Sequence, residues 1–391
     1  MAAFNDQVAL LAEPQKGRDL RVDFFRGLAL WWIFVDHVPH DVLGTLSIRN
    51  FALCDATEIF VFLAGFAGGI AYGRTLDRQG WLYAGADSLR RAWTLYIAHI
   101  FLFVVFSAQV AWSAAALSRT DYLDEIHLDV IGNHPYRALL QALTLHFQPA
   151  YLNILPMYIV LLAGFALLLP LLRTPWLLAA LSAALYLAVQ ITGWNLPSWT
   201  GGTWFFDPMA WQALFVLGAL ISYHRPAIAW FARPWPRFGL DALAILTLLF
   251  GLWLLAFWQH PAWAHALPRA LAHRLSTVPK STLDPLRFTS FLALAWLARR
   301  LVSPLAPWVQ SNWAKPFVIA GQHSLPVFCF GIFASFIGRV AMEQGTGPLR
   351  QLLVNLLGTL ALAAVGALAA WYKRRGKRVD AAPKKAMVAA E

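Results

Sequence analysis

The sequence has little charge and few cysteines for its length. Only 13% of its 391 residues are Asp, Glu, Lys or Arg, whereas 59% are hydrophobic. A soluble core of this size would not need so much apolar surface, so we predict a polytopic membrane protein. Two cysteines are present, Cys54 and Cys329, both within or beside apolar runs and without the spacing of metal ligands. We interpret them as packing residues and expect no metal site.

The first twenty residues also lack the apolar stretch of a signal peptide, so we expect the first membrane helix to be retained. Internal repeats and a separable soluble domain are lacking too. The expected organisation is a cytoplasmic segment over 1–21, a transmembrane domain over 22–372 and a basic cytoplasmic tail over 373–391.

Apolar runs predict an all-α fold with about ten membrane-spanning helices, each long enough to cross a bilayer or nearly so. The expected helices cover about Val22–Leu46, Cys54–Leu76, Ser88–Ala115, Tyr151–Leu172, Pro175–Gly193, Pro208–Tyr223, Leu240–Trp258, Pro285–Leu301, Pro316–Met342 and Leu349–Tyr372.

Basic residues predict the orientation of these helices. The formal net charge is +11, and most of the 31 Lys and Arg residues lie in alternate inter-helix segments or in the tail that begins at Lys373. This asymmetry places both termini in the cytoplasm. The positive charge is therefore a topology signal with contacts to membrane lipids, and we expect no nucleic-acid partner. Two longer segments, 116–150 and 259–284, are predicted to be external.

The first predicted helix contains charged residues that a membrane helix normally avoids. A helix advances 100° per residue, so Arg26 and His37 share one face about 16 Å apart along the axis. Asp36 precedes His37, and Asp23 lies one turn before Arg26. Charged groups in hydrocarbon usually face a cavity or a partner. The row of polar groups predicts a long, anionic, partly polar ligand.

Further polar residues lie in later predicted helices, and the predicted orientation gives the depth of each one in the membrane. Glu58 is expected one turn inside the external surface, Arg90 and Arg91 at the inner end of their helix, and His99 near the middle of the membrane. Lys315 marks the inner boundary of the ninth predicted helix, which continues through Gln322, His323 and Ser324.

This depth order fits the binding of an acyl-coenzyme A. Arginines bind phosphates through forked hydrogen bonds, and a neutral imidazole is the usual base for a hydroxyl nucleophile. We therefore expect Arg26, Arg90, Arg91, His99, Lys315, His323 and Ser324 to contact the donor. His37 is the expected catalytic base, with Asp36 or Glu58 orienting it or positioning the acceptor.

Several segments resemble a known family. The segments RVDFFRGLALWWIFVDH, EIFVFLAGF, QPAYLNILPMYIVLL, DPMAWQALFVLG and GQHSLPVFCFG are similar, in this order, to the OpgC family of the membrane acyltransferase-3 superfamily. The resemblance covers nearly the whole chain. It implies a bacterial inner-membrane enzyme that moves an acyl group, succinyl or acetyl, from cytoplasmic acyl-CoA to a periplasmic glucan. It also implies that His37 is the base and Arg26 the motif arginine.

Other interpretations stay open at this point. A transporter or flippase of an anionic glycan or lipid also needs buried charges, and a related enzyme would acetylate an amino sugar. The Asp55–Glu58 spacing also fits a helix-capping box. The tryptophans of the segment WNLPSWTGGTWFF fit an interfacial belt or stacking on sugars. The oligomeric state is open, a dimer included.

Overall fold

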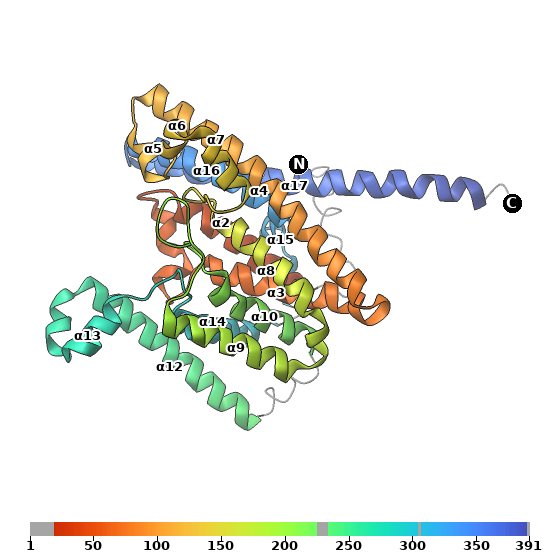
Figure 1. Cartoon of the computed structure of the whole chain (residues 1–391), viewed down its shortest axis with the longest axis horizontal. Coiled ribbons are helices and arrows are strands. Elements are labelled where there is room, and N and C mark those ends of the chain that lie inside the picture. Colours follow the sequence, from red (N-terminus) through yellow and green to blue (C-terminus); the bar gives the residue numbers. More distant parts are fainter. Residues whose placement is uncertain (1–18, 225–233, 304–305, 389–391) are drawn as a thin grey trace. The chain divides into compact units, whose positions relative to one another are not determined.

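A computed structural model describes residues 19–224, 234–303 and 306–388 (Figure 1). Over these residues the regular structure is helical, apart from one isolated β-bridge between Pro197 and Thr203, which confirms the all-α prediction. Most of the predicted N-terminal cytoplasmic segment, the basic segment 225–233 and the last three residues lie outside the described residues. The chain forms two compact units. Unit 1 comprises residues 1–50 and 298–391, and unit 2 comprises residues 51–297.

Seven of the described helices are long and apolar enough to cross a membrane, so the chain is a multi-pass membrane protein. They are α3 (Ala56–Gln79), α4 (Trp81–Leu117), α8 (Ile154–Leu168) with the 3₁₀ helix η3 (Leu169–Arg173), α9 (Pro175–Thr192), α12 (Pro234–Gln259), α16 (Ser324–Glu343) and α17 (Pro348–Val388). Three other predicted spans correspond to the shorter helices α2 (Leu20–Asp36), α10 (Pro208–Tyr223) and α14 (Pro285–Leu301). The count of ten and the orientation remain predictions.

Prolines explain two departures from the predicted helices. The ninth predicted span is divided at His323 into α15 (Lys315–Gln322) and α16. Pro326 is the cause, because its ring would clash with the Gln322 carbonyl in a continuous helix. The first span ends at Asp36 rather than near Leu46, and a 3₁₀ helix, η1 (Val42–Leu46), follows beyond Pro39.

The third predicted span is longer than expected. It begins at Trp81 rather than Ser88, and its 37 residues form one helix, α4. At 1.5 Å per residue α4 is about 55 Å long, well beyond the roughly 30 Å of a hydrocarbon core. Its first turns therefore extend past the apolar layer when its central part spans it.

Glycines set the packing of unit 1, where α15, α16 and α17 surround α2. A Cβ at Gly27 of α2 would collide with the Phe317 backbone of α15, and a Cβ at Gly321 of α15 would collide with the Asp23 backbone. The two helices therefore contact each other backbone to backbone, as small residues allow in membrane proteins. Phe24 packs beside this contact against Val318 and Val309 of the 3₁₀ helix η6 (Pro307–Gln310).

Unit 2 contains two close helix pairs. The pair α3–α10 is brought together by Gly65, Gly69 and Gly218, each facing the backbone of the other helix. The pair α4–α8 is joined by side-chain donors of α4, because Trp81 Nε1 donates to the Ala166 carbonyl and Ser88 Oγ to the Leu162 carbonyl. The short helices of unit 2 are α5 (Asp121–Glu125), α6 (Asp129–Asn133), α7 (Pro135–Leu143), η5 (Pro261–Ala266) and α13 (Arg269–Ser276).

Three loops of unit 2 gather at one end, which we call the loop end and define as residues 144–153, 193–207 and 277–284. The Trp199 N–H donates to the His146 carbonyl, and the Asp207 N–H donates to the Ser281 carbonyl. Tyr186 of α9 and Trp211 of α10 also donate to the third loop, at Leu283 and Ser281. The loop end is thus an ordered, hydrogen-bonded structure over the N-termini of α3, α10 and α14.

Candidate active site

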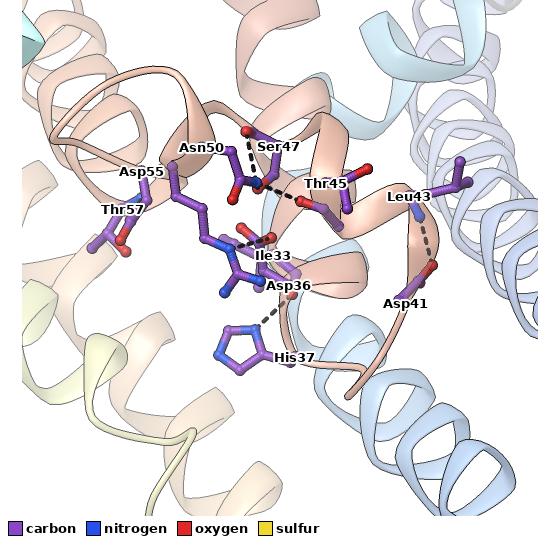
Figure 2. Close-up of polar contacts among 12 residues, drawn as sticks. Ile33, Asp36, His37, Asp41, Leu43, Thr45, Ser47, Asn50, Asp55 and Thr57 are labelled. Carbon is purple, nitrogen blue, oxygen red and sulfur yellow. Dashed lines mark hydrogen bonds and ion pairs between the residues drawn. The ribbon is translucent and has the colours of Figure 1, made fainter. Parts of the chain in front are cut away.

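His37 lies at the C-terminal end of α2, where its imidazole is held by a backbone acceptor. Its Nδ1 lies 2.6 Å from the Ile33 carbonyl oxygen, one turn earlier on the helix (Figure 2). A carbonyl only accepts hydrogen bonds, so Nδ1 carries the proton. In the neutral ring Nε2 therefore has the lone pair. The side chain is partly buried.

Asp36 is engaged by an arginine that the sequence interpretation did not single out. Arg49 Nε lies 3.1 Å from Asp36 Oδ1, and η2 (Ile48–Asn50) positions it. The Asp36 side chain is 11% exposed and that of Arg49 51% exposed. This pair ties the loop after α2 back onto the helix end that presents His37. Asp36 thus has a structural partner of its own, and its predicted role in orienting the imidazole remains a prediction.

The remaining predicted residues of unit 1 lie on α2, α15 and α16. Gln322 Nε2 donates to the buried carboxylate of Asp23, at 3.3 Å. Arg26 lies one turn after Asp23 on α2 and is partly buried. His323 and Ser324 follow Gln322 directly, at the break between α15 and α16. The close α2–α15 contact therefore brings the elements that hold Arg26, His323 and Ser324 side by side.

Lys315 begins α15, and its Nζ donates to Asn312 Oδ1 at 2.8 Å. It lies about two turns before His323 along that helix. Its predicted role at the donor site remains a prediction.

Glu58 of unit 2 lies in a buried ion cluster at the N-terminus of α3. Its carboxylate is fully buried, accepts the Asp55 N–H at 2.9 Å and completes the capping box with Asp55. Arg287 Nε of α14 donates to Glu58 Oε1 at 2.7 Å, and Arg287 Nη2 lies 3.1 Å from Asp55 Oδ2. Lys280 Nζ lies 2.6 Å from the same Asp55 oxygen. Glu58 is therefore a structural cap, and its proposed catalytic role is untested.

The cluster also sets the ionisation of Asp55, just outside the α3 span. Burial by itself would raise the pKa of Asp55. The charges of Lys280 and Arg287, with the hydrogen bonds that Asp55 accepts, outweigh burial and hold this pKa well below its usual range. Sequence reasoning missed Lys280 and Arg287. The signal for Arg287 was a lone arginine one turn into an apolar helix, which needs a buried partner.

The predicted donor residues on α4 differ sharply in burial. Arg90 and Arg91 are exposed in the third turn of α4, and their assignment to the donor remains a prediction. His99, two turns later, is fully buried, and among the described residues neither of its ring nitrogens has a hydrogen-bond partner. Buried polar atoms normally have partners, so His99 is the residue of α4 that most requires a ligand or water.

No group of three His, Cys, Asp or Glu within the described ranges is arranged to hold a metal ion. The candidate residues fall into two groups, one in each unit. His37, Asp36, Arg26, Lys315, His323 and Ser324 belong to unit 1. Glu58, Arg90, Arg91 and His99 belong to unit 2.

Comparison with known proteins gives one match. A family model described as OpgC protein matches residues 18–374. No curated protein matches the chain, and no solved structure does. The matched region includes every candidate residue.

Proposed function

From the premise that the chain belongs to the OpgC family, we propose that it is a glucan-modifying acyltransferase of the bacterial inner membrane. It transfers an acyl group, with succinyl as the first candidate, from cytoplasmic acyl-CoA to a hydroxyl of a periplasmic glucan. The placement in the acyltransferase-3 superfamily is part of this proposal. The observation that supports it best is the hydrogen bond that fixes the orientation of the His37 imidazole.

The hydrogen bond from His37 Nδ1–H to the Ile33 carbonyl gives the ring the tautomer that a general base needs. Nε2 takes the proton of the acceptor hydroxyl as that oxygen attacks the thioester carbonyl. A C–O bond forms and the C–S bond breaks, and the leaving coenzyme A thiolate recovers the proton from the imidazolium. The partial negative charge at the C-terminus of α2 stabilises that imidazolium.

No covalent intermediate is required by this scheme. The two cysteines are the strongest nucleophiles the chain offers, and Cys54 is 1% exposed, directly before the Asp55–Glu58 cluster. Its surroundings hold two carboxylates, which disfavour a thiolate. Direct transfer demands that donor and acceptor are bound together.

The donor site is proposed on the residues that the sequence predicted. Arg26 binds phosphate or the acyl carboxylate, His323 and Ser324 contribute from the break between α15 and α16, and Lys315 contributes from the start of α15. Discontinuous membrane helices commonly provide polar backbone groups to bound ligands. The sequence also assigns Arg90, Arg91 and His99 of unit 2 to the donor, and this assignment stays a prediction.

The decisive test uses purified protein in lipid nanodiscs with acyl-CoA and a glucose oligosaccharide, following both released thiol and acylated sugar. His37→Asn keeps a side-chain donor for the Ile33 carbonyl but has no base, so turnover should fall roughly 10²-fold or more. His40→Asn is the matched control, because His40 is exposed in the same loop, with φ 57°, a conformation that Asn tolerates.

Near-normal transfer by His37→Asn would overturn the role of the base. An acyl group trapped on Cys54 would overturn direct transfer. In sealed proteoliposomes of the same protein, oligosaccharide that crosses the bilayer without acylation would indicate a transporter and overturn the enzyme.

A further inference from the structure

Three buried polar atoms of the loop end have no hydrogen-bond partner among the described residues: Gln148 Oε1, Trp204 Nε1 and Asp207 Oδ2. Trp204 is 5% exposed and Asp207 fully buried. Leaving such atoms unsatisfied costs about 1–3 kcal/mol each, so folded proteins normally provide a partner, a bound molecule or water.

A nearby indole and the other polar atoms of Asp207 and Gln148 have hydrogen-bond partners. Trp211 Nε1 donates to the Ser281 carbonyl at 3.0 Å, although Trp211 is as buried as Trp204. Asp207 Oδ1 accepts the Met209 N–H at 2.9 Å and so caps α10. Gln148 Nε2 donates to the Leu145 carbonyl at 2.9 Å. Asp207 and Gln148 are therefore held in place by their other polar atoms, with one oxygen of each left unsatisfied.

The backbone joins the two loops that hold the three residues. Residues 196–204 form a hairpin, in which the Trp204 N–H donates to the Leu196 carbonyl. The hairpin is docked on the first loop by the Trp199 N–H, which donates to the His146 carbonyl, and by the Trp199 ring, 5.4 Å from that of Phe147. Gln148 follows Phe147, and Asp207 lies three residues after Trp204.

The chemistry of this set selects a hydroxylated ligand. It has one donor, the Trp204 indole N–H, and two acceptors, the Asp207 carboxylate and the Gln148 amide oxygen. A sugar hydroxyl both donates and accepts, so the hydroxyls of a sugar offer partners to atoms of both kinds. An anionic group would be repelled by Asp207.

Exposed aromatic rings of the second loop favour a sugar further. Trp194 and Phe205 of the same loop are 52% and 50% exposed. Such rings provide apolar faces on which the C–H side of a pyranose packs, with polar groups fixing its orientation.

We propose that Gln148, Trp204 and Asp207 form a subsite for a neutral glucose unit of the acceptor. Its assignment to the acceptor rests on the proposed function, whereas binding of the sugar does not. The residues position the acceptor and take no part in bond breaking.

The test is binding of a glucose hexasaccharide to the full chain in nanodiscs without acyl-CoA, together with thermal unfolding of each variant. Trp204→Phe removes an indole N–H that has no partner among the described residues, together with part of the indole ring. Affinity should fall about fivefold to tenfold, and the unfolding temperature should fall less than in a tryptophan that also loses a protein hydrogen bond. Asp207→Asn keeps the helix cap and should also weaken binding.

Trp211→Phe is the matched control. It loses a hydrogen bond to the Ser281 carbonyl, so it should lower the unfolding temperature and leave hexasaccharide affinity unchanged. Both variants lose the same ring volume, so a larger affinity loss in Trp204→Phe and a larger stability loss in Trp211→Phe separate a ligand contact from a structural one.

Unchanged affinity in Trp204→Phe, or no hexasaccharide binding by the parent at about 10 mM, would overturn the subsite and leave water as its occupant. Sugar binding that depends on Trp204 would uphold the subsite even if His37→Asn retained transfer. If the protein acylates another acceptor but does not bind the hexasaccharide, the acyltransferase function stands and the glucose subsite is wrong.

Discussion

Replacing Arg287 by Met should destabilise unit 2 more than most single substitutions. Arg287 Nε is the side-chain donor to the fully buried Glu58, at 2.7 Å, and Arg287 Nη2 also faces Asp55. Removing one partner of a buried ion pair leaves an uncompensated charge, at a cost of about 3–5 kcal/mol. Lys280 still pairs with Asp55, so we expect about 3 kcal/mol, a fall of roughly 6–12 °C in unfolding temperature.

A maleimide dye that fluoresces on reaction with thiols measures this unfolding. Cys54 is 1% exposed and directly precedes Asp55, so it reacts when the cluster opens. Cys329 is partly exposed and is replaced by Ser to remove its signal. The matched control is Arg119→Met, because Arg119 and Asp121 are 44% and 55% exposed in their ion pair and such pairs contribute at most about 1 kcal/mol.

A double variant decides whether the buried charge is the cause. Glu58→Gln removes the charge but keeps an acceptor for the Asp55 N–H, so adding it to Arg287→Met should recover at least about 1 kcal/mol. A loss below about 0.5 kcal/mol in Arg287→Met, or no recovery in the double variant, would refute the reasoning. The lowered pKa of Asp55 adds a pH signature: its stabilisation is complete above the ordinary Asp value and is lost as pH falls through the lower folded-state value.

Three further predictions use the same unfolding assay. His99→Leu should raise stability by about 1–3 kcal/mol, since it removes buried nitrogens that have no partner among the described residues, while raising the KM for acyl-CoA; unchanged KM would remove His99 from the donor site. Gly321→Ala should cost about 1–3 kcal/mol, because its Cβ meets the Asp23 backbone, whereas Gly164→Ala, with open space around its Cβ, should be neutral or stabilising; equal effects would contradict the close packing. Burial raises the pKa of Asp207 to about 6, above its ordinary value. The free energy of unfolding should therefore fall by about 1–3 kcal/mol as pH rises from 4 to 6, and Asp207→Asn should flatten this slope.

The membrane class and most helices could be predicted from the sequence, because apolar runs of the right length need no knowledge of their neighbours. The same holds for the capping box at Asp55 and Glu58, which is a local pattern. The break at His323 is also predictable in principle, because Pro326 forbids a continuous helix through Gln322. Hydrophobicity alone, however, predicts a single span there.

Tertiary structure alone decided which polar residues meet. Arg287 and Glu58 are far apart in sequence, and nothing local says that the N-termini of α3 and α14 lie together. Trp204 and Trp211 are both buried tryptophans, yet the fold gives the indole N–H of Trp211 an acceptor and leaves that of Trp204 without one among the described residues. Hydrophobic periodicity is a property of one helix, whereas the satisfaction of a buried charge or donor depends on every element that packs around it.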